Sequence, residues 1–377
     1  MPVFYKPVPT SEHDDEESQN LTKSRSARIK TTLFYFVATI AVMYVAYLAT
    51  RSIIRSVPKH GMHGRPGCHH RNLTTLPSHH ILPSGDKIPS VALGVWQAGK
   101  GEVGAAVQTA LKTGYRHIDG AWIYGNEEEV GKAISASGVP RDQLWLTSKL
   151  WNNFHAPEDI EPALDETLTR LNTEYLDLYL IHWPIAFKKG SNNVLDKELT
   201  ANPYPTWQKL EELVDKGKIR NIGISNFNIA RIKNLTANPL KHKPAVNQVE
   251  LNYFNPQPEL LKWSKENGLL LEAYSPLGST KQVKEALSVP EVKEIAKKLD
   301  ITPAQALISW HVQRGTIVLP KSVTPSRVQE NFQVVTLPDD LFDKLEKAAT
   351  SHPPQRVVNP SKNWGLDFDV FDENWPL

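Results

Sequence analysis

Residues 115 to 124 read Tyr-Arg-His-Ile-Asp-Gly-Ala-Trp-Ile-Tyr, so that Asp119 and Tyr124 follow a predicted strand at its carboxyl end. A lysine and a histidine stand at comparable points of two later stretches. Leu146 to Leu150 reads Leu-Thr-Ser-Lys-Leu, and Leu178 to Pro184 reads Leu-Tyr-Leu-Ile-His-Trp-Pro. If these strands are parallel neighbours, their polar side chains meet at one edge of the sheet.

Strand-like and helix-like segments alternate on both sides of this stretch. The predicted strands are Val91–Gly94, Tyr115–Asp119, Leu144–Lys149, Leu176–His182, Ile219–Ile224, Val246–Glu250, Leu269–Tyr274 and Ile317–Leu319. The predicted helices are Glu102–Lys112, Glu127–Ser137, Pro157–Leu171, Pro205–Lys216, Asn228–Leu235, Pro258–Asn267, Val289–Val312 and Pro325–Phe332. Eight such pairs in roughly 250 residues are typical of an α/β fold, the (β/α)8 TIM barrel.

Three further segments flank this predicted barrel. Leu82 to Pro89, with Ser-Gly-Asp at its turn, predicts a β-hairpin before the first strand. Pro338 to Ala349 predicts a last helix, and the chain then continues as an irregular tail to Leu377.

The chemistry of such a barrel gathers at the carboxyl ends of its strands. Asp119 and Tyr124 follow the second predicted strand, Lys149 ends the third and His182 ends the fourth. Each alone has an ordinary structural explanation, as a half-buried aromatic, a solvated strand end or a satisfied core histidine. Four on consecutive strand ends indicate a catalytic site.

These four residue types suit proton transfer to a carbonyl group that receives a hydride. A tyrosine with a pKa near 10 needs tuning to donate near neutrality. We expect the Lys149 cation to lower the pKa of Tyr124, a shift of about three units corresponding to roughly 4 kcal/mol. Asp119 would hold Lys149 and keep it charged, and His182 would orient the carbonyl oxygen and assist the proton relay.

The chain before the barrel divides into three predicted segments. Residues 1–30 are polar and predict a disordered tail. Residues 31–50 carry no charge, and about twenty apolar residues are the length of a single transmembrane helix. Residues 51–71 are rich in Pro, Gly and His and predict a linker, which leaves residues 72–377 for the barrel. Basic residues balance on the two sides of the span and do not orient it.

The composition argues against two other classes of function. A net charge of +2 gives no reason to expect nucleic acid. The single cysteine, Cys68, excludes disulfides within the chain. Because His69, His70, His79 and His80 match no standard zinc spacing with it, no metal site is predicted.

A glycine pattern offers an alternative reading of the cofactor site. Gly99, Gly101 and Gly104 form G-x-G-x-x-G before a predicted helix, and Asp119 follows about twenty residues later, as in a Rossmann dinucleotide site. The pattern is weak, because the preceding strand ends at Gly94. A Rossmann-type dehydrogenase predicts that replacing Gly99 and Gly101 abolishes cofactor binding, whereas the barrel predicts almost no change.

A second candidate cofactor site lies late in the chain, where barrels commonly bind phosphate. The segment Ala273 to Ser279 supplies Tyr274, a ring able to stack on a nicotinamide, and then small residues whose amides can approach a pyrophosphate. Two cations and two hydroxyls surround a predicted helix N-terminus at Lys321, Ser322, Thr324 and Arg327. That set suits the phosphate monoester of NADP(H) rather than NAD(H).

Several motifs together resemble the aldo-keto reductase family, from about Leu82 to the C-terminus. They are Gly-Tyr-Arg-His-Ile-Asp at 114–119, Leu-Asp-Leu-Tyr-Leu-Ile-His-Trp-Pro at 176–184, Gly-Ile-Ser-Asn-Phe at 223–227 and Leu-Pro-Lys-Ser-Val-Thr at 319–324. The resemblance implies the barrel, NADP(H), and a catalytic tetrad of Asp119, Tyr124, Lys149 and His182. The stretches 272–280 and 310–315 look most similar to fungal glycerol dehydrogenase and aldehyde reductase members.

The resemblance also implies roles for residues around the cofactor and substrate. Those at the nicotinamide are Ser225, Asn226, Gln248 and Tyr274, and those at the pyrophosphate are Ser275, Leu277 and Ser279. Those at the 2'-phosphate are Lys321, Ser322, Thr324 and Arg327, with Glu330 and Asn331 at the adenine. The implied substrate pocket consists of His182 and an aromatic wall of Trp96, Trp151 and Trp183.

The expected function is therefore NADPH-dependent, reversible reduction of small-molecule carbonyl compounds by a monomer tethered to a membrane. A cofactor-sensing accessory subunit of a membrane protein is the alternative, because of the predicted span. The abundance of NADPH in the cytosol places the barrel on that side. Attached sugar at Asn72 or Asn234, both in glycosylation acceptor sequences, would contradict that placement.

Overall fold

The computed structural model describes residues 76–191 and 193–373, and its centre is an eight-stranded parallel sheet. The strands are β3 (Leu93–Gly94), β4 (His117–Asp119), β5 (Trp145–Leu150), β6 (Leu176–Ile181), β9 (Ile219–Ser225), β10 (Val246–Glu250), β11 (Leu270–Tyr274) and β12 (Ile317–Leu319). A parallel bridge between Val91 and Val318 joins the two edges. The amide of Ala92 donates to the Val318 carbonyl at 2.9 Å and reinforces the closure. The predicted barrel is confirmed.

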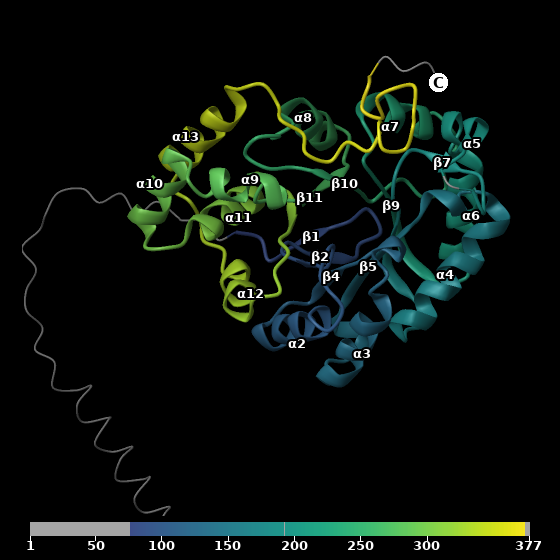
Figure 1. Ribbon diagram of the computed structural model, residues 1–377, viewed down its shortest axis with the longest axis horizontal. Helices are drawn as coiled ribbons and strands as arrows, with labels where there is room; N and C mark the ends of the chain where they lie inside the picture. Colours follow the sequence, from purple (N-terminus) through teal and green to yellow (C-terminus); the bar gives the residue numbers. More distant parts are fainter. Residues whose placement is uncertain (1–75, 192, 374–377) are drawn as a thin grey trace, which may run out of the picture. The chain divides into compact units, whose positions relative to one another are not determined.

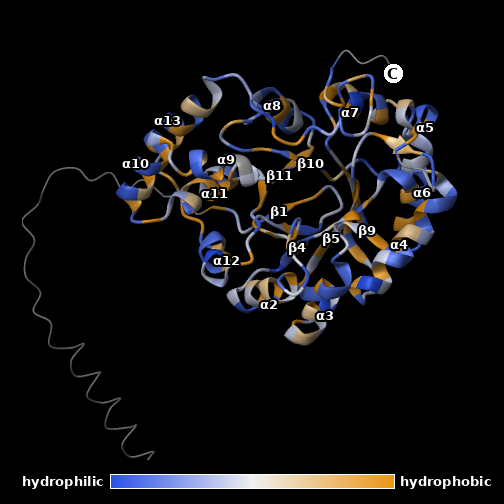
Figure 2. Cartoon of the chain, viewed as in Figure 1, coloured by the Kyte–Doolittle hydropathy of each residue, from blue (hydrophilic) through white to orange (hydrophobic). Residues whose placement is uncertain are grey.

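Helices surround the strands on the outside (Figure 1). They are α2 (Val103–Thr113), α3 (Glu127–Ser137), α4 (Pro157–Leu171), α5 (Lys197–Ala201), α6 (Tyr204–Asp215), α7 (Ile229–Thr236), α8 (Pro258–Glu266), α9 (Ser279–Ala286), α10 (Pro290–Leu299), α11 (Pro303–Gln313), α12 (Pro325–Phe332) and α13 (Asp339–Thr350). Short 3-10 turns are η1 (Trp122–Tyr124), η2 (Arg141–Gln143) and η3 (Asn152–Phe154). Most of these helices carry both hydrophobic and hydrophilic residues, as an amphipathic helix over a core requires, whereas α11 is buried from Ala304 to Val312 (Figure 2).

Helix α2 illustrates how the local sequence sets these elements. Its buried residues recur at the spacing of one helical face: Val103, Ala106, Val107, Ala110 and Leu111. It ends at Gly114, whose φ of 119° is accessible to glycine and strained for other residues. The chain then enters the stretch that carries the site residues.

One predicted helix is wrong, because Val289–Val312 is two helices. Helix α10 ends where Asp300 takes a left-handed conformation with a φ of 53°. Thr302 begins α11 with a capping box to Gln305, and Pro303 occupies its first turn. The sequence Thr-Pro-Ala-Gln is a helix-start signal, and it overrides the continuous apolar periodicity around it.

The stretch 185–204, which the sequence did not assign, contains a small hairpin of β7 (Ala186–Phe187) and β8 (Leu195–Asp196), followed by α5. Helix α9 also lies in a segment to which the sequence assigned no element. The described part of the C-terminal tail beyond α13 forms no helix or strand, as expected.

The predicted β-hairpin is confirmed, as β1 (His79–Ile81) paired with β2 (Lys87–Pro89), and it plugs the amino-terminal end of the barrel. Leu82 and Ile88 are buried in one apolar cluster with Leu178, Val246 and Ile317 from the strands. With one end plugged, the opposite end remains for a site.

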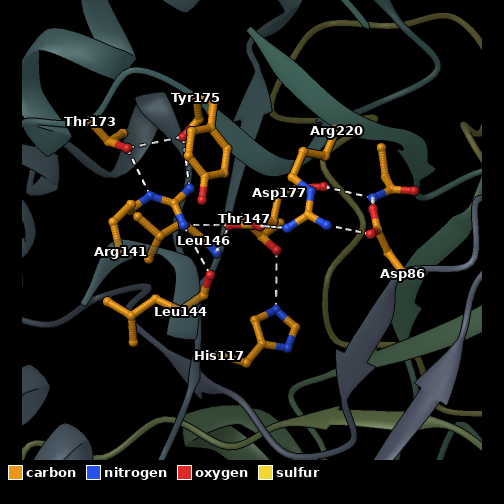
Figure 3. Close-up of polar contacts among 11 residues, drawn as sticks. Asp86, His117, Arg141, Leu144, Leu146, Thr147, Thr173, Tyr175, Asp177 and Arg220 are labelled. Atoms are coloured by element: carbon orange, nitrogen blue, oxygen red, sulfur yellow. Dashed lines mark hydrogen bonds and ion pairs between the residues drawn. The ribbon is translucent and has the colours of Figure 1, made fainter. Parts of the chain in front are cut away.

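An ion-pair network ties the hairpin turn to this end of the barrel (Figure 3). Asp177 is buried and accepts from Arg141 Nη1 at 2.7 Å and from Arg220 Nη1 at 3.2 Å. Arg220 also pairs with Asp86 in the turn, and Asn221 donates to the same carboxylate at 2.7 Å. These ion pairs connect the hairpin turn to β6 and β9 and to the segment before β5.

No helix within residues 76–191 and 193–373 is long and apolar enough to cross a membrane. The predicted span at residues 31–50 lies outside the described residues, as do the predicted tail 1–30 and linker 51–71.

Candidate active site

The structure brings the four predicted residues together at the carboxyl end of the barrel. Asp119 ends β4, Lys149 lies in β5, His182 directly follows β6, and Tyr124 closes the 3-10 turn η1 after β4. The Tyr124 ring lies 5.9 Å from the His182 ring, centroid to centroid, and Lys149 Nζ lies 5.3 Å from the Tyr124 centroid. Three neighbouring strands therefore supply one compact cluster.

Lys149 is completely buried and all its hydrogen-bond donors have partners. Its Nζ lies 2.9 Å from both carboxylate oxygens of Asp119 and 2.7 Å from the carbonyl oxygen of Gly120. Burial alone would lower the pKa of Lys149, but the charge of Asp119 and its hydrogen bond to Lys149 oppose this effect, and the pKa is raised. The contact between Asp119 and Lys149 is the one that the sequence predicted.

The expected fall in the pKa of Tyr124 is not found. Burial raises the pKa of Tyr124 and Asp119 adds to the rise, while Lys149 opposes both without reversing them. The physical reason is that a phenol buried at a cavity wall loses more by desolvation of its anion than one lysine restores, since that lysine is already neutralised by Asp119. Tyr124 is therefore a protonated phenol with a cation beside it.

His182 is a neutral imidazole. Burial lowers the pKa of His182 well below its ordinary value, and the nearby Lys149 and His155 lower it further. Among the described residues its Nδ1 has no hydrogen-bond partner. A neutral ring can still orient a carbonyl oxygen through one N–H, whereas the proton-relay role would require a charged form that this site disfavours.

A second carboxyl group lies beneath this cluster and was not predicted as a site residue. Glu272 in β11 is fully buried, and its Oε2 accepts from Gln248 Nε2 at 2.9 Å. The same Gln248 nitrogen donates to Asp119 Oδ2 at 2.8 Å. Burial, reinforced by the negative charge of Asp119, raises the pKa of Glu272 from 4.5 to about 8. Gln248 thus bridges Asp119 and the buried Glu272 carboxyl group, whose raised pKa favours its protonated form near neutral pH.

A cavity of about 880 Å³ opens beside the cluster. Its wall includes Asp119, Tyr124 and His182, while Lys149 lies behind it. It also includes the residues predicted at the cofactor, namely Ser225, Asn226, Gln248, Tyr274, Ser275, Leu277, Ser279, Lys321, Ser322, Arg327, Glu330 and Asn331. Thr324 is the exception: it is exposed, and its amide donates to Ser322 Oγ at 3.1 Å.

Backbone strain concentrates on the same wall. Asn226, Ser275 and Ser279 adopt positive φ angles of 65°, 50° and 55°. The hydroxyl of Tyr274 donates to Asn226 Oδ1 at 2.7 Å, so the two residues brace each other. At Gly278 an added Cβ would lie 2.9 Å from the Gln282 side chain, which leaves no room for a side chain in this turn. Strained, closely approached backbone is characteristic of ligand sites.

Comparisons with known proteins agree with this geometry. Residues 90–350 match the model of the aldo/keto reductase family. The chain belongs to this family. It is 43% identical over 306 residues to glycerol 2-dehydrogenase (NADP(+)) of Saccharomyces cerevisiae, covering 77% of this chain and 96% of that one. It is 43% identical over 310 residues to D/L-glyceraldehyde reductase of Hypocrea jecorina, covering 76% and 92%.

Among solved structures, the aldose reductase of Schistosoma japonicum superimposes with a TM-score of 0.72 at 38% identity. The superposition covers 79% of this chain and 99% of that one. The likeness therefore includes the whole of that barrel.

In this aldo/keto reductase the predicted aromatic wall is present, and the tail adds to it. Trp96, Trp151 and Trp183 line the cavity as expected. So do Ile123, Val358 and Trp364, which sequence reasoning missed. The Trp364 ring lies 5.1 Å from the Trp183 ring and 6.0 Å from the Trp151 ring, both edge to face. The signal available in the sequence was the cluster of aromatic residues in the tail after residue 363.

The Rossmann alternative fails on the structure. The amides of Gly101 and Gly104, which would face a pyrophosphate, donate instead to the carboxylate of Glu129 at 3.0 and 2.9 Å. The Glu129 carboxylate therefore occupies the position at the amino end of α2 where a pyrophosphate would bind. Within the described residues, no group of three or more His, Cys, Asp or Glu side chains could hold a metal.

We expect Glu272→Gln to make the enzyme's stability less dependent on pH. The folded state holds Glu272 with a raised pKa, so its contribution is fully present below pH 4.5 and is lost as pH rises toward 8. Between pH 5 and 8 the free energy of unfolding of the parent should fall by roughly 3 kcal/mol because of this group. The variant should not show this fall. Urea unfolding at both pH values measures the difference. Glu259→Gln, an exposed carboxyl on α8, is the control.

Proposed function

We propose that this aldo/keto reductase reduces small uncharged aldehydes to alcohols with NADPH, with Tyr124 as the proton donor. The observation that carries the proposal is a fully buried Lys149 held between the Asp119 carboxylate and the face of the Tyr124 ring, at the wall of the cavity. Such a lysine stabilises the phenolate that remains after proton transfer, and stabilising charge that develops in the transition state accelerates the reaction.

The residues of the cavity fit NADP(H). Its wall combines Tyr274, a ring available for stacking, with the cations Lys321 and Arg327. Bound there, the cofactor would supply a hydride to the carbonyl carbon. The chain's own contribution is then to place the carbonyl oxygen between Tyr124 and His182, to give that oxygen the Tyr124 proton, and to keep water away with the apolar wall.

The finer choice of substrate combines the relatives with the lining. Both relatives compared above act, by their names, on glycerol or glyceraldehyde. The cavity wall that contains Tyr124 also includes Ile123, Trp151 and Trp183, which are apolar and aromatic. We therefore expect glyceraldehyde and benzaldehyde both to be reduced.

The test is the consumption of NADPH by the full-length chain with these two aldehydes. Turnover of at least one supports the proposal. Tight NADPH binding with no turnover of either aldehyde would reject it and favour the accessory-subunit role. None of the relatives compared above is named as such a subunit, so the reductase is the better supported of the two.

Arg327→Ala should weaken the preference for NADPH over NADH. We propose that Arg327, an exposed cation of α12 that lines the cavity, pairs with the 2'-phosphate. Losing a charge-assisted pair of this kind should raise the KM for NADPH about tenfold or more and leave the KM for NADH nearly unchanged. Gln329→Ala, on the same helix, is the control. An equal rise for both cofactors would contradict the assignment.

We propose further that residues 31–50 anchor the enzyme as a single-pass membrane protein with the barrel in the cytosol, and that the barrel acts as a monomer. The uncharged apolar run supports the anchor, and the NADPH requirement supports the side. Protease treatment of intact vesicles tests the orientation, because a cytosolic barrel is digested and a lumenal one is protected. Sugar attached at Asn234 would contradict the cytosolic placement.

A further inference from the structure

Glu250 is a buried carboxylate that the proposed chemistry does not use. It ends β10, two residues after Gln248, and pairs in register with Tyr274 of β11. Its side chain is fully buried, and its charge partly offsets the lowering of the Arg356 pKa that burial causes. A buried charge of this kind needs hydrogen bonds to compensate for its lost hydration.

Those hydrogen bonds come from the backbone of the C-terminal tail. The amide of Val357 lies 2.9 and 3.1 Å from the two carboxylate oxygens, and the amide of Val358 donates to Oε2 at 2.7 Å. Asn252 adds a weaker contact to Oε1 at 3.3 Å. Backbone N–H groups that converge on a carboxylate form charge-assisted bonds, which are about twice as strong as neutral ones.

The tail begins to form the substrate wall at this point. Val358 itself lines the cavity, and the chain then continues to Trp364, whose ring packs against Trp151 and Trp183. Upstream, the amide of Gln355 donates to the Phe254 carbonyl at 2.8 Å. This hydrogen bond holds the tail just before the wall, whereas Glu250 holds Val357 and Val358, where the wall segment begins.

The far end of the tail is fastened separately, to α7. Glu373 accepts from the amides of Ile229 and Ala230 at 3.3 and 3.0 Å, and Asn228 donates to the Asp372 carbonyl at 3.1 Å. Trp364 therefore lies on a segment with two fixed ends and no helix or strand of its own. Releasing one end should loosen the wall without disturbing the turn η1, which carries Tyr124, or the strand β5, which carries Lys149.

We propose that Glu250 is a positioning residue for the substrate wall. Its buried carboxylate accepts hydrogen bonds from the amides of Val357 and Val358, and these bonds fix Val358 and Trp364 against bound aldehyde. The inference rests on the proposed reductase function. It assigns substrate discrimination to a residue of the barrel that lies beneath the tail. The binding of aldehydes large enough to touch the wall depends on these hydrogen bonds, and the binding of small aldehydes does not.

The decisive variant is Glu250→Gln, which keeps the size of the side chain but turns one acceptor into an N–H donor facing backbone N–H groups. We expect the KM for benzaldehyde to rise about tenfold, while kcat and the KM for glyceraldehyde change by less than about threefold. Glu259→Gln should match the parent. Equal changes for both aldehydes, or none for either, would overturn the proposal.

A second variant guards against a general loss of structure. Trp364→Ala should also raise the KM for benzaldehyde, and in the double variant with Glu250→Gln the two effects should not add, because both act through one wall. Additive effects would show that Glu250 acts elsewhere and would overturn the proposal.

Loosening of the tail can be measured without enzyme turnover. A failure of the proposal for Glu250 can therefore be told apart from a failure of the proposed reductase function. Lys362 is an exposed trypsin site in the wall segment. Because proteolysis requires local opening, we expect cleavage after Lys362 to be about tenfold faster in Glu250→Gln than in the parent and in Glu259→Gln. An unchanged rate of cleavage after Lys362 would overturn the proposed role of Glu250 in holding the tail, even if the parent reduced no aldehyde.

Discussion

Replacing Tyr124 by phenylalanine should lower kcat for aldehyde reduction by two orders of magnitude or more, with little change in NADPH binding. The substitution removes one hydroxyl and keeps the ring that faces Lys149 and His182. A positioned general acid contributes about 10² to 10⁴ in rate, so its loss falls on kcat. NADPH consumption under saturating aldehyde measures the effect, and cofactor-induced fluorescence change measures binding.

The comparison needs a tyrosine whose loss should not matter. Tyr175 precedes β6 at the amino-terminal end of the barrel, where its ring lies 3.9 Å from the Arg141 guanidinium carbon (Figure 3). Tyr175→Phe should keep the parental kcat. If Tyr124→Phe also kept it, another group would have to supply the proton. The neutral His182, whose pKa lies far below its ordinary value, is a poor candidate for that task.

The sequence predicted the barrel and the cluster because both depend on local signals. Strand ends are marked by turn residues after apolar runs, and in a parallel barrel all such ends face one mouth. Asp119, Lys149 and His182 could therefore be placed together from their positions alone. The helix boundary at Asp300 was missed because apolar periodicity continues across it, although Thr302 and Pro303 signalled a new start.

Other features depended on contacts between distant segments, which a single sequence does not encode locally. Glu272 looked like an ordinary strand residue, and only its burial beside Gln248 and Asp119 raises its pKa. Trp364 lies in a tail with no regular structure, so no local pattern predicted its place in the substrate wall. The pKa of Tyr124 was predicted in the wrong direction, because the strength of desolvation depends on packing that the motif does not reveal.

Removing the buried cation should damage both stability and activity. In Lys149→Met the Asp119 carboxylate stays buried with Gln248 as its remaining partner, and an uncompensated buried charge costs roughly 3–5 kcal/mol of unfolding free energy. We expect kcat to fall at least about a hundredfold, because the phenolate of Tyr124 would lose its neighbouring charge. Urea unfolding and NADPH consumption give the two values.

The double variant Asp119→Asn with Lys149→Met separates these two roles of the pair. With both charges gone, the penalty for an unpaired buried ion disappears, so the double variant should be more stable than Lys149→Met alone. It should remain as inactive, since stability does not replace the missing cation. Lys344→Met breaks an exposed pair with Glu294 and should change neither property appreciably. A double variant no more stable than the single would mean that the buried pair contributes through packing rather than charge. A double variant that regained activity would mean that Tyr124 donates its proton without help from Lys149.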